Sequence, residues 1–403
     1  MKKVELISPG GNLEKAKTAF LYGADSVYLG GKKFNLRSRA GNLTFSEIAR
    51  IIDLSKRLKK NVYLTLNIYF RNSDFRELKT YLGTLLEIGV KNLIISDFGI
   101  VTVIHQYFKD KFHLTASTQT NITNYQAAEL YRSLGIKRII PARELTLKEI
   151  SYIKKKTKMS LETFIHGAMC VSYSGRCLLS EYFTSRSANR GDCSHPCRWE
   201  YVLQEKKRRD EYLPVEEDPR GSLILSSKDL CMIEDIPKMI EAGIDAFKIE
   251  GRMKSLYYVA NVTRVYRDAI DAHYNKQKKK LSFWKRELDA VSHRTFFKGF
   301  YFGYDHQSLC AEKTYKRQYR FVGYIKEKIG HEIYSVCFKN SLKKDDKLES
   351  ILPNMKNIDL DEFVILDKGF QIVKEAKISD RFYLKTPEDL EPYAILRVSN
   401  QDL

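Results

Sequence analysis

Four cysteines lie within 28 residues of the sequence, close enough for their thiolates to bind one metal centre. Cys170, Cys177, Cys193 and Cys197 are separated by six, fifteen and three residues. Four thiolates complete the ligand set of a 4Fe–4S cluster or of a tetrahedral zinc ion. Structural zinc usually binds tight cysteine pairs, and only Cys193 and Cys197 form one. The spacing therefore favours an iron–sulfur cluster, with zinc as the alternative.

A nucleophilic cysteine is a different interpretation of the same segment. His166 lies four residues before Cys170, and a Cys–His pair can catalyse acyl transfer when a third group orients the imidazole. This interpretation leaves the other three cysteines of the segment without a role. Elsewhere, Cys231, Cys310 and Cys337 fall in apolar stretches, where we expect them to be structural.

Eight short apolar segments alternate with amphipathic ones before residue 250, and they must position these cysteines. The segments begin at Val4, Ser26, Val62, Asn92, His113, Arg138, Leu161 and Phe247. Such alternation predicts an α/β fold with a parallel sheet, and eight units are the number that closes a TIM-barrel-like (β/α)₈ structure. An open doubly wound sheet is the alternative.

A barrel would place functional residues where its strands end. Polar residues do stand at those positions, namely Ser8, Asn67, Ser96, Asp97, Ser117, Gln119, Arg143, Glu144, His166, Glu250 and Arg252. We expect them to form the rim of one site, although strand ends also emerge into solvent for purely structural reasons.

Three regions follow from these patterns. Residues 1–275 form the predicted barrel, interrupted at 167–245 by an insertion that carries the four cysteines and the charged run EKKRRDE from Glu205. Residues 276–317 look like a basic linker. Residues 318–403 contain short alternating apolar runs, which predict a small all-β barrel or sandwich.

The chain is strongly basic, with 69 Lys and Arg against 50 Asp and Glu and a formal charge of +19. That charge favours binding to RNA or DNA, while a solvated basic surface is the alternative. We expect no membrane span. The apolar run near the N-terminus is too short for a signal peptide, so we expect a cytoplasmic protein, where thiols stay reduced.

The cysteine segment resembles the signature of the collagenase-like "U" peptidase family. The matching residues are Glu162, Phe164, Gly167, Ala168, Met169, Cys170, Gly175, Cys177, Leu179 and Ser180. The similarity extends through RGDCSHPCRWEY and SSKDLCMIEDIPKMIEAGIDAFKIEGRMKS, and so over nearly the whole chain. Within that family the sequence is most similar to the tRNA hydroxylation proteins.

This resemblance implies a barrel-like N-terminal region, a 4Fe–4S cluster held by the four cysteines and a small C-terminal β-domain. It also implies a reaction, the prephenate-dependent hydroxylation of the tRNA wobble uridine to 5-hydroxyuridine without molecular oxygen. The alternatives are a collagenase-like peptidase, for which the family offers no catalytic dyad, and an RNA-binding scaffold without chemistry.

Under this hypothesis a tRNA anticodon loop docks on the basic face and the uridine enters the barrel mouth. Prephenate, a dicarboxylate, would need cations there, and the candidates are Arg143, Lys248, Arg252 and Lys254. Candidates for proton transfer are His166, Glu162 and Glu250. Strand alternation predicts that Glu162 and His166 share a face. Ion pairing of Glu250 and hydrogen bonding of a packed His166 are the structural alternatives, and the cluster could be redox-active or structural.

Overall fold

The structure is a computed structural model that describes residues 3–37, 41–170, 172–199, 217–218, 221–222, 228–278, 280–303, 316–378 and 382–400. The chain forms two compact units. The barrel unit comprises Met1–Phe20, Asp25–Met253 and Arg294–Tyr315, and the C-terminal unit comprises Leu21–Ala24, Lys254–His293 and Lys316–Leu403. Each unit is described by itself.

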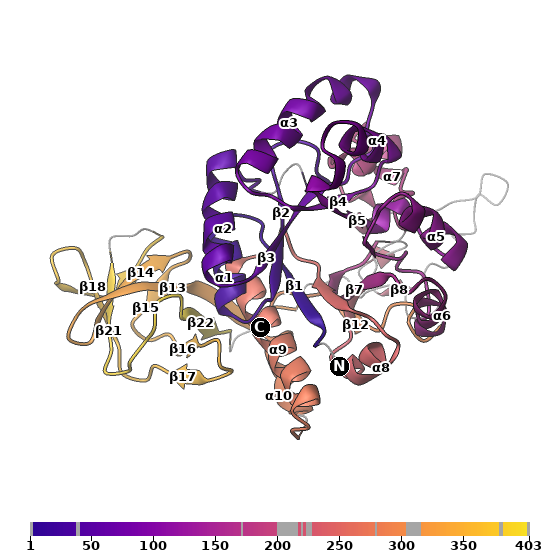
Figure 1. Cartoon of the computed structure of the whole chain (residues 1–403). Helices are drawn as coiled ribbons and strands as arrows, with labels where there is room; N and C mark the ends of the chain where they lie inside the picture. The colour runs from indigo at the N-terminus through magenta and orange to yellow at the C-terminus, as the bar shows by residue number, and fades with distance from the viewer. Residues whose placement is uncertain are drawn as a thin grey trace, which may run out of the picture. The chain divides into compact units, whose positions relative to one another are not determined.

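Eight parallel strands close into a barrel (Figure 1). They are β1 (Glu5–Pro9), β2 (Ser26–Gly30), β3 (Asn61–Leu66), β4 (Asn92–Ile95), β5 (His113–Ala116), β6 (Arg138–Ile139), β7 (Ser160–Ala168) and β11 (Ala246–Ile249). Consecutive strands pair in order, and β11 pairs in parallel with both β1 and β7. The predicted (β/α)₈ barrel is confirmed, and the open sheet is wrong.

Helices follow the strands, and their sequences explain where they begin. They are α1 (Leu13–Leu21), α2 (Phe45–Arg57), α3 (Phe75–Glu87), α4 (Phe98–Tyr107), α5 (Tyr125–Ser133), α6 (Leu147–Thr157) and α8 (Ile236–Glu241), with short 3₁₀ turns at Asn72–Asp74, Lys109–Lys111 and Thr118–Thr120. In α2, Thr44 and Glu47 form a capping box, and Ile48, Ile51 and Ile52 make the buried face. Capping satisfies the free amides of the first turn, and the apolar stripe packs on the sheet.

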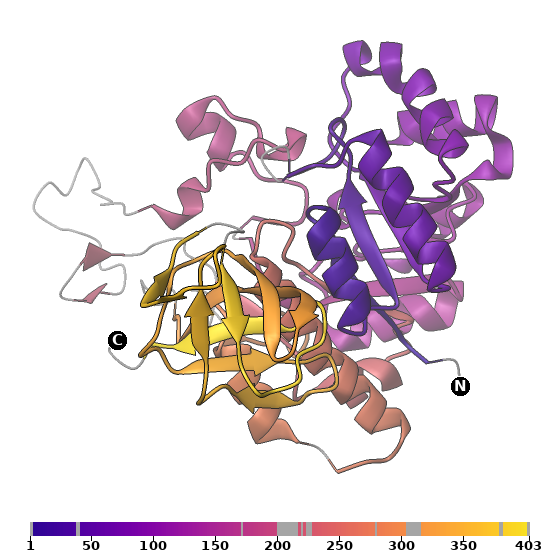
Figure 2. The same cartoon turned by 90° about the vertical axis from the view of Figure 1, so that its left-hand side faces the viewer.

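The cysteine segment leaves the barrel after β7. It contains α7 (Leu179–Thr184) and 3₁₀ turns at Ala188–Arg190 and Pro196–Arg198. Figure 2 shows it in pink, at the end of the barrel towards which the strand arrows point. β8 (Glu217–Asp218) pairs with β9 (Gly221–Ser222), β10 (Asp229–Cys231) pairs with β7, and β12 (Phe296–Phe297) pairs with β10. The predicted charged run from Glu205 lies outside the described residues.

The C-terminal unit is an all-β domain with two helices, α9 (Leu256–Tyr274) and α10 (Leu281–Asp289). Its main sheet has the order β17-β16-β22-β13-β14-β21-β18-β19 and antiparallel pairing. The strands are β13 (Tyr319–Gly330), β14 (Ile333–Phe338), β16 (Leu348–Ile351), β17 (Asn357–Asp359), β18 (Val364–Leu366), β19 (Ile372–Val373), β21 (Tyr383–Lys385) and β22 (Ile395–Ser399), while β15 (Leu342–Lys343) pairs with β20 (Glu375–Ala376). The predicted C-terminal all-β domain is confirmed.

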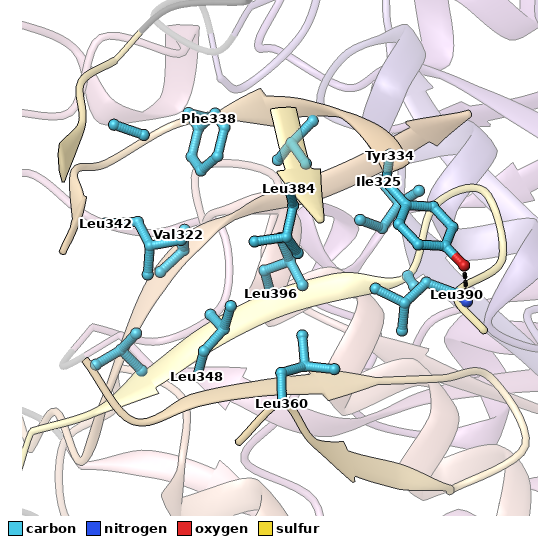
Figure 3. Close-up of a cluster of buried hydrophobic side chains, with 14 of the residues drawn as sticks. Val322, Ile325, Tyr334, Phe338, Leu342, Leu348, Leu360, Leu384, Leu390 and Leu396 are labelled. Atoms are coloured by element: carbon cyan, nitrogen blue, oxygen red, sulfur yellow. Dashed lines mark hydrogen bonds between the residues drawn. The ribbon is translucent and has the colours of Figure 1, made fainter. Parts of the chain in front are cut away.

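The hydrophobic cluster in the β-domain of this unit is apolar except for the hydroxyl of one tyrosine, Tyr334. Val322, Phe338 and Leu396 are among the buried side chains of the cluster in Figure 3. The hydroxyl of Tyr334 accepts a hydrogen bond from the Leu390 amide at 3.2 Å. This contact satisfies the one polar group that Tyr334 brings into the core.

A buried ion network joins α9 and α10 to β22 within the C-terminal unit. Glu287 Oε2 lies 2.6 Å from Arg264 Nη2 and 2.9 Å from Arg397 Nη1. Arg397 also pairs with Glu349 at 2.7 Å. Both helices therefore belong to the β-domain, although α10 lies in the segment that its composition marks as a basic linker.

Within the described part of the chain, none of the helices has the length and apolar character needed to cross a membrane.

Candidate metal centre and active-site cavity

A cavity of about 160 Å³ lies at the mouth of the barrel unit, and all four cysteines of the predicted centre line it. The barrel supplies the opposite wall through residues predicted from their positions at strand ends, namely Asn67, Ser117, Gln119, Arg143, Glu250 and Arg252. Ser8, Ser96, Asp97, Glu144 and His166, which were predicted from the same rule, are not among the lining residues. The cysteine segment and the strand ends thus enclose one site.

Two glycines allow the cysteine segment to approach the barrel. Gly175 has φ +75° and Gly191 has φ +96°, in the region that residues with a side chain rarely adopt. A Cβ at Gly175 would lie 2.4 Å from the Gln119 carbonyl oxygen, and one at Gly191 would lie 2.5 Å from that of Asn35. Any side chain at either position would push the cysteine loop away from the cavity.

Hydrogen bonds fix the same loop to the β3–α3 connection. Arg190 Nη1 donates to the Tyr69 carbonyl at 2.6 Å and to Asp74 Oδ2 at 2.9 Å. The Tyr69 amide donates to the Asn189 carbonyl at 3.0 Å, and Asn189 Nδ2 donates to the Cys177 carbonyl at 2.9 Å. The backbone beside Cys177 is therefore held by a chain of contacts that starts on the barrel.

The charges around the cysteines differ from one thiol to the next. Desolvation disfavours the thiolate of Cys170, whose side chain opens on the cavity, but Arg143 and then Arg37 and Arg198 outweigh it and lower its pKa. Burial, followed by the neighbouring thiols, raises the pKa of Cys197 to about 11. Besides burial, the other thiols also raise the pKa of Cys193 and Cys197, because thiolates that share a cavity repel one another.

The donor set fits an iron–sulfur cluster. Four sulfurs line one cavity, and three guanidinium groups lie beside them, which suits a cluster whose thiolate ligands make it anionic. In the described ranges, no group of three or more His, Cys, Asp or Glu side chains is arranged to hold one metal ion. The four cysteines therefore line one cavity, but their side chains do not converge on one position.

Glu250 is the acidic residue of the cavity wall. Its Oε1 lies 3.4 Å from Arg37 Nη2, and its Oε2 accepts a hydrogen bond from the Tyr28 hydroxyl at 3.3 Å. Burial raises the pKa of Glu250, but Arg37, Arg143 and Arg252 more than reverse this, so its pKa is lowered. Glu250 is a carboxylate at neutral pH and can accept a proton or a hydrogen bond.

Three of the four predicted substrate-binding cations line the cavity, and each has different surroundings. Arg143 Nη1 donates to the Ala168 carbonyl at 3.4 Å. Lys248 Nζ donates to Glu162 Oε1 at 2.7 Å and lies 4.4 Å from the centre of the Tyr28 ring.

Arg252 is buried and donates to Thr65 Oγ1 at 3.3 Å, to Asn35 Oδ1 at 3.1 Å and to Asn42. Burial lowers its pKa to about 10. Asn35 and Asn42 lie in the loop that follows β2, so their hydrogen bonds to Arg252 hold this loop in place. Lys254 belongs to the C-terminal unit, where it donates to the Ser292 carbonyl at 2.9 Å.

The other two residues predicted to transfer protons do not line the cavity. Glu162 lies inside the barrel, bound to Lys248 and 3.4 Å from Arg138 Nη1. His166 packs against the Phe296 ring, with centroids 5.3 Å apart. The prediction that Glu162 and His166 share a face is wrong, because the register of β7 against β11 skips one residue before His166 and reverses the alternation.

The cavity residues that the sequence reasoning missed include Tyr28, Arg37, His195 and Arg198. Arg198 directly follows Cys197, and an arginine next to a thiolate ligand is a usable signal because it stabilises that charge. Arg37 lies in the loop after β2. Loops that follow the strands of a barrel commonly form its active site. Of the remaining cysteines, Cys337 is buried and Cys231 half-buried, and Cys310 lies outside the described residues.

The fold and site define a (β/α)₈ barrel protein with a cysteine-lined, arginine-rich cavity at the C-terminal face of the strands and an all-β C-terminal domain. Residues 11–310 match the model of peptidase family U32, and residues 317–397 match that of the peptidase family U32 C-terminal domain. The chain belongs to this family, which confirms the resemblance noted from the cysteine segment.

Three relatives show which proteins of the family this chain is similar to. The tRNA hydroxylation protein P1 of Bacillus subtilis (strain 168) is 40% identical, over 88% of this chain and 85% of that protein. The tRNA hydroxylation protein P of Escherichia coli (strain K12) is 32% identical, over 98% of this chain and 97% of that protein. The 23S rRNA 5-hydroxycytidine C2501 synthase of Escherichia coli (strain K12) is 37% identical, over 67% of this chain and 40% of that protein.

Proposed function

We propose that this protein is an RNA-modifying enzyme that hydroxylates the wobble uridine of tRNA to 5-hydroxyuridine in a prephenate-dependent reaction. Relatives that match most of the chain are named for tRNA hydroxylation, and a further one is named for hydroxylation of an rRNA base. The observation that carries the proposal is the cavity in which four cysteines, a carboxylate and several cations meet at the barrel mouth.

An RNA substrate agrees with the charge and the position of the cavity. The formal charge of +19 attracts phosphates, and anticodon-loop bases are unpaired, so one of them can be splayed out at low cost. The uridine would enter the cavity between the cysteine segment and the strand ends.

The cations of the cavity support an acidic second substrate such as prephenate. Arg143 Nε is buried and has no hydrogen-bond partner among the described residues, and the guanidinium interacts with Cys170, so a carboxylate that reached Nε beside this thiol would satisfy the donor. Arg37 and Lys248 also line the cavity, but each already pairs with a carboxylate, Glu250 and Glu162. Arg252 shapes the loop through Asn35 and Asn42. A bidentate carboxylate would gain most from Arg143 because the guanidinium fork matches its two oxygens.

Cys170, Cys177, Cys193 and Cys197 would hold a 4Fe–4S cluster, with zinc as the alternative. When bound, the cluster supplies one-electron transfer or keeps the cysteine loop in shape. Glu250, held as a carboxylate by Arg37, would accept a proton or a hydrogen bond from the bound base.

Location in the cytoplasm stays a prediction.

The test of the reaction is mass spectrometry of tRNA nucleosides from a deletion strain that has no redundant relatives. We expect wobble 5-hydroxyuridine to disappear and to return when the gene is restored. Normal levels in the deletion strain would overturn the proposal. Binding of tRNA without any change in modification would indicate a scaffold instead.

The test of the cofactor is iron and sulfide content together with the visible absorption spectrum after anaerobic purification. Replacing any of the four cysteines by serine should lower the iron content, while Cys231→Ser, a half-buried cysteine outside the cavity, should not. Stoichiometric zinc without iron in the unmodified protein would replace the cluster by a zinc site.

The family description makes proteolysis the second candidate. The arrangement gives the Cys170–His166 pair no support, because Cys170 lines the cavity while His166 packs on Phe296 outside its lining; the histidine that does line the cavity is His195. Cleavage of gelatin by the purified protein, abolished by Cys170→Ser with the metal retained, would nevertheless favour a peptidase.

A further inference from the structure

We propose that residues 172–199 carry a stacking platform for unpaired RNA bases, formed by Tyr173, Tyr182, Phe183 and Trp199. The platform deepens the proposed function and rests on it, since it assigns the surface that would hold the bases next to the target nucleotide. Each ring offers a flat apolar face, and nucleobases stack on such faces with little regard to sequence.

Exposure of these rings is the first observation. Tyr182 is 83% exposed, Tyr173 51%, Phe183 46% and Trp199 42%. In the described residues ten aromatic side chains are exposed, and four of them lie in this segment; the others are Phe45, Phe98, Tyr107, Tyr152, Phe302 and Phe370. Tyr182 and Phe183 are neighbours on α7, and exposed apolar side chains that lie side by side mark a binding site.

The geometry joins the platform to the cavity. Tyr173 lines the cavity and also reaches solvent, and Trp199 directly follows Arg198, another lining residue. Tyr182 and Phe183 lie on α7 with ring centroids 5.2 Å apart and planes at 87°. Figure 2 shows the pink segment that contains α7 at the end of the barrel towards which the strands point. A strand whose base enters the cavity would therefore pass beside this segment.

Internal hydrogen bonds hold α7 in place. The Ser194 hydroxyl lies 2.9 Å from the Ser180 hydroxyl and 2.8 Å from that of Thr184, which links both ends of the helix to the cysteine loop. Rings on a fixed element lose little conformational entropy when a base stacks on them. The helix that carries Tyr182 and Phe183 is therefore held in place before RNA binds.

The charge of the segment favours RNA as the occupant. It contains Arg176, Arg186, Arg190 and Arg198 against Glu181 and Asp192. Arg186 pairs with Asp192 and Arg190 with Asp74, so Arg176 is the cation that carries this argument. Arg176 is exposed between Tyr173 and Cys177 and can reach a phosphate. Rings interleaved with cations match the alternation of bases and phosphates in a single strand. A protein partner would need no such cations.

The experiment measures binding of a fluorescent anticodon stem-loop RNA to the full-length, anaerobically purified protein. We expect Tyr182→Ala/Phe183→Ala to bind the RNA at least about tenfold more weakly, since stacking on one ring contributes about 1–3 kcal/mol per base. Tyr182→Phe/Phe183→Tyr should restore binding because it keeps both rings. Iron content and the visible spectrum should match those of the unmodified protein in each variant.

Tyr107→Ala/Tyr152→Ala is the matched control. Tyr107 on α4 and Tyr152 on α6 are 47% and 50% exposed and lie outside the cavity lining. Equal loss of RNA binding in this control would overturn the platform, because it would make the effect one of general surface change.

The outcomes separate the platform from the proposed function. Unchanged RNA binding by Tyr182→Ala/Phe183→Ala, with its metal content intact, overturns the platform even if the deletion strain lacks 5-hydroxyuridine. The variant could bind RNA more weakly while the deletion strain keeps its 5-hydroxyuridine. This result would support the platform and reject the proposed reaction. Loss of a protein partner with RNA binding unchanged also overturns it.

Discussion

Arg37 Nη2 lies 3.4 Å from Glu250 Oε1, although 213 positions separate the two residues in the chain. Arg37 follows β2 and Glu250 follows β11, and both strands are neighbours of β1 in the closed barrel. Closure of the barrel therefore creates the pair. It keeps a carboxylate and a guanidinium together in the cavity that the cysteines line.

Glu250→Gln tests the role of this carboxylate. The change keeps the shape of the side chain but removes the charge that holds Arg37 and accepts protons, so we expect 5-hydroxyuridine to fall by about tenfold or more, as for loss of a positioned acid–base group. The measurement is nucleoside mass spectrometry after complementation, with protein and iron content checked. Glu241→Gln, an exposed position on α8, is the control and should complement fully. Full activity of Glu250→Gln would contradict the assignment.

Gly175→Ala should displace the cysteine loop. Its Cβ would lie 2.4 Å from the Gln119 carbonyl oxygen, and its φ of +75° would add strain of about 1–2 kcal/mol. We expect less iron per chain and a lower melting temperature. Gly83→Ala is the control, because nothing lies within 4 Å of a Cβ at that position in α3, and a helical alanine stabilises by about 0.5–1 kcal/mol. Equal iron content in both variants would show that the close approach is not required.

Asp74→Ala should loosen the cysteine segment without touching the cavity lining. Asp74 accepts from Arg190 Nη1 at 2.9 Å, and this hydrogen bond, which outweighs burial, lowers the pKa of Asp74. Without it we expect iron to be lost to a chelator several times faster, because a charge-assisted hydrogen bond contributes about 1.5–3 kcal/mol. Asp53→Ala removes only a surface pair 4.0 Å from Lys56 and should release iron at the normal rate. Identical release rates would argue against the tether.

Glu287→Ala should destabilise the C-terminal unit strongly. The change leaves Arg264 and Arg397 buried without their shared carboxylate, and removal of one partner from a buried ion pair costs about 3–5 kcal/mol. Urea unfolding of the full chain, followed by circular dichroism, measures the loss. Asp345→Asn, which breaks an exposed pair with Lys344, should change the free energy of unfolding little. A similarly small effect of Glu287→Ala would show that the network is not stabilising.

The same network predicts a dependence of stability on acid. Burial raises the pKa of Glu287, but hydrogen bonding to Arg397 and the charges of Arg397 and Arg264 lower it overall. A carboxyl with a depressed pKa contributes stability above its unfolded pKa of about 4.3, and this is lost as pH falls through the folded value. The difference in unfolding free energy between the unmodified protein and Glu287→Gln should therefore shrink below about pH 4.3. A constant difference down to pH 2 would contradict this.

Local sequence patterns were sufficient for most of the barrel. Apolar runs such as the one from Val62 became β3, and the amphipathic stretch between the runs from Ser26 and Val62 contains α2, which a capping box begins at Thr44. Periodicity and capping are properties of neighbouring residues, so they can be read without knowing the fold. Strands β15, β16 and β17 were missed because short strands owe their existence to partners elsewhere in the sheet.

The sequence by itself determined the four cysteines, the barrel order and the polar strand ends of this protein. Only the tertiary structure decided which of those residues share the cavity. The pairing of β7 with β11 is irregular beside His166, and His166 is not a lining residue. Closure of the barrel brings Arg37 next to Glu250. Side-chain direction depends on register, and contact between distant residues depends on closure. Neither is encoded in the spacing of neighbouring residues.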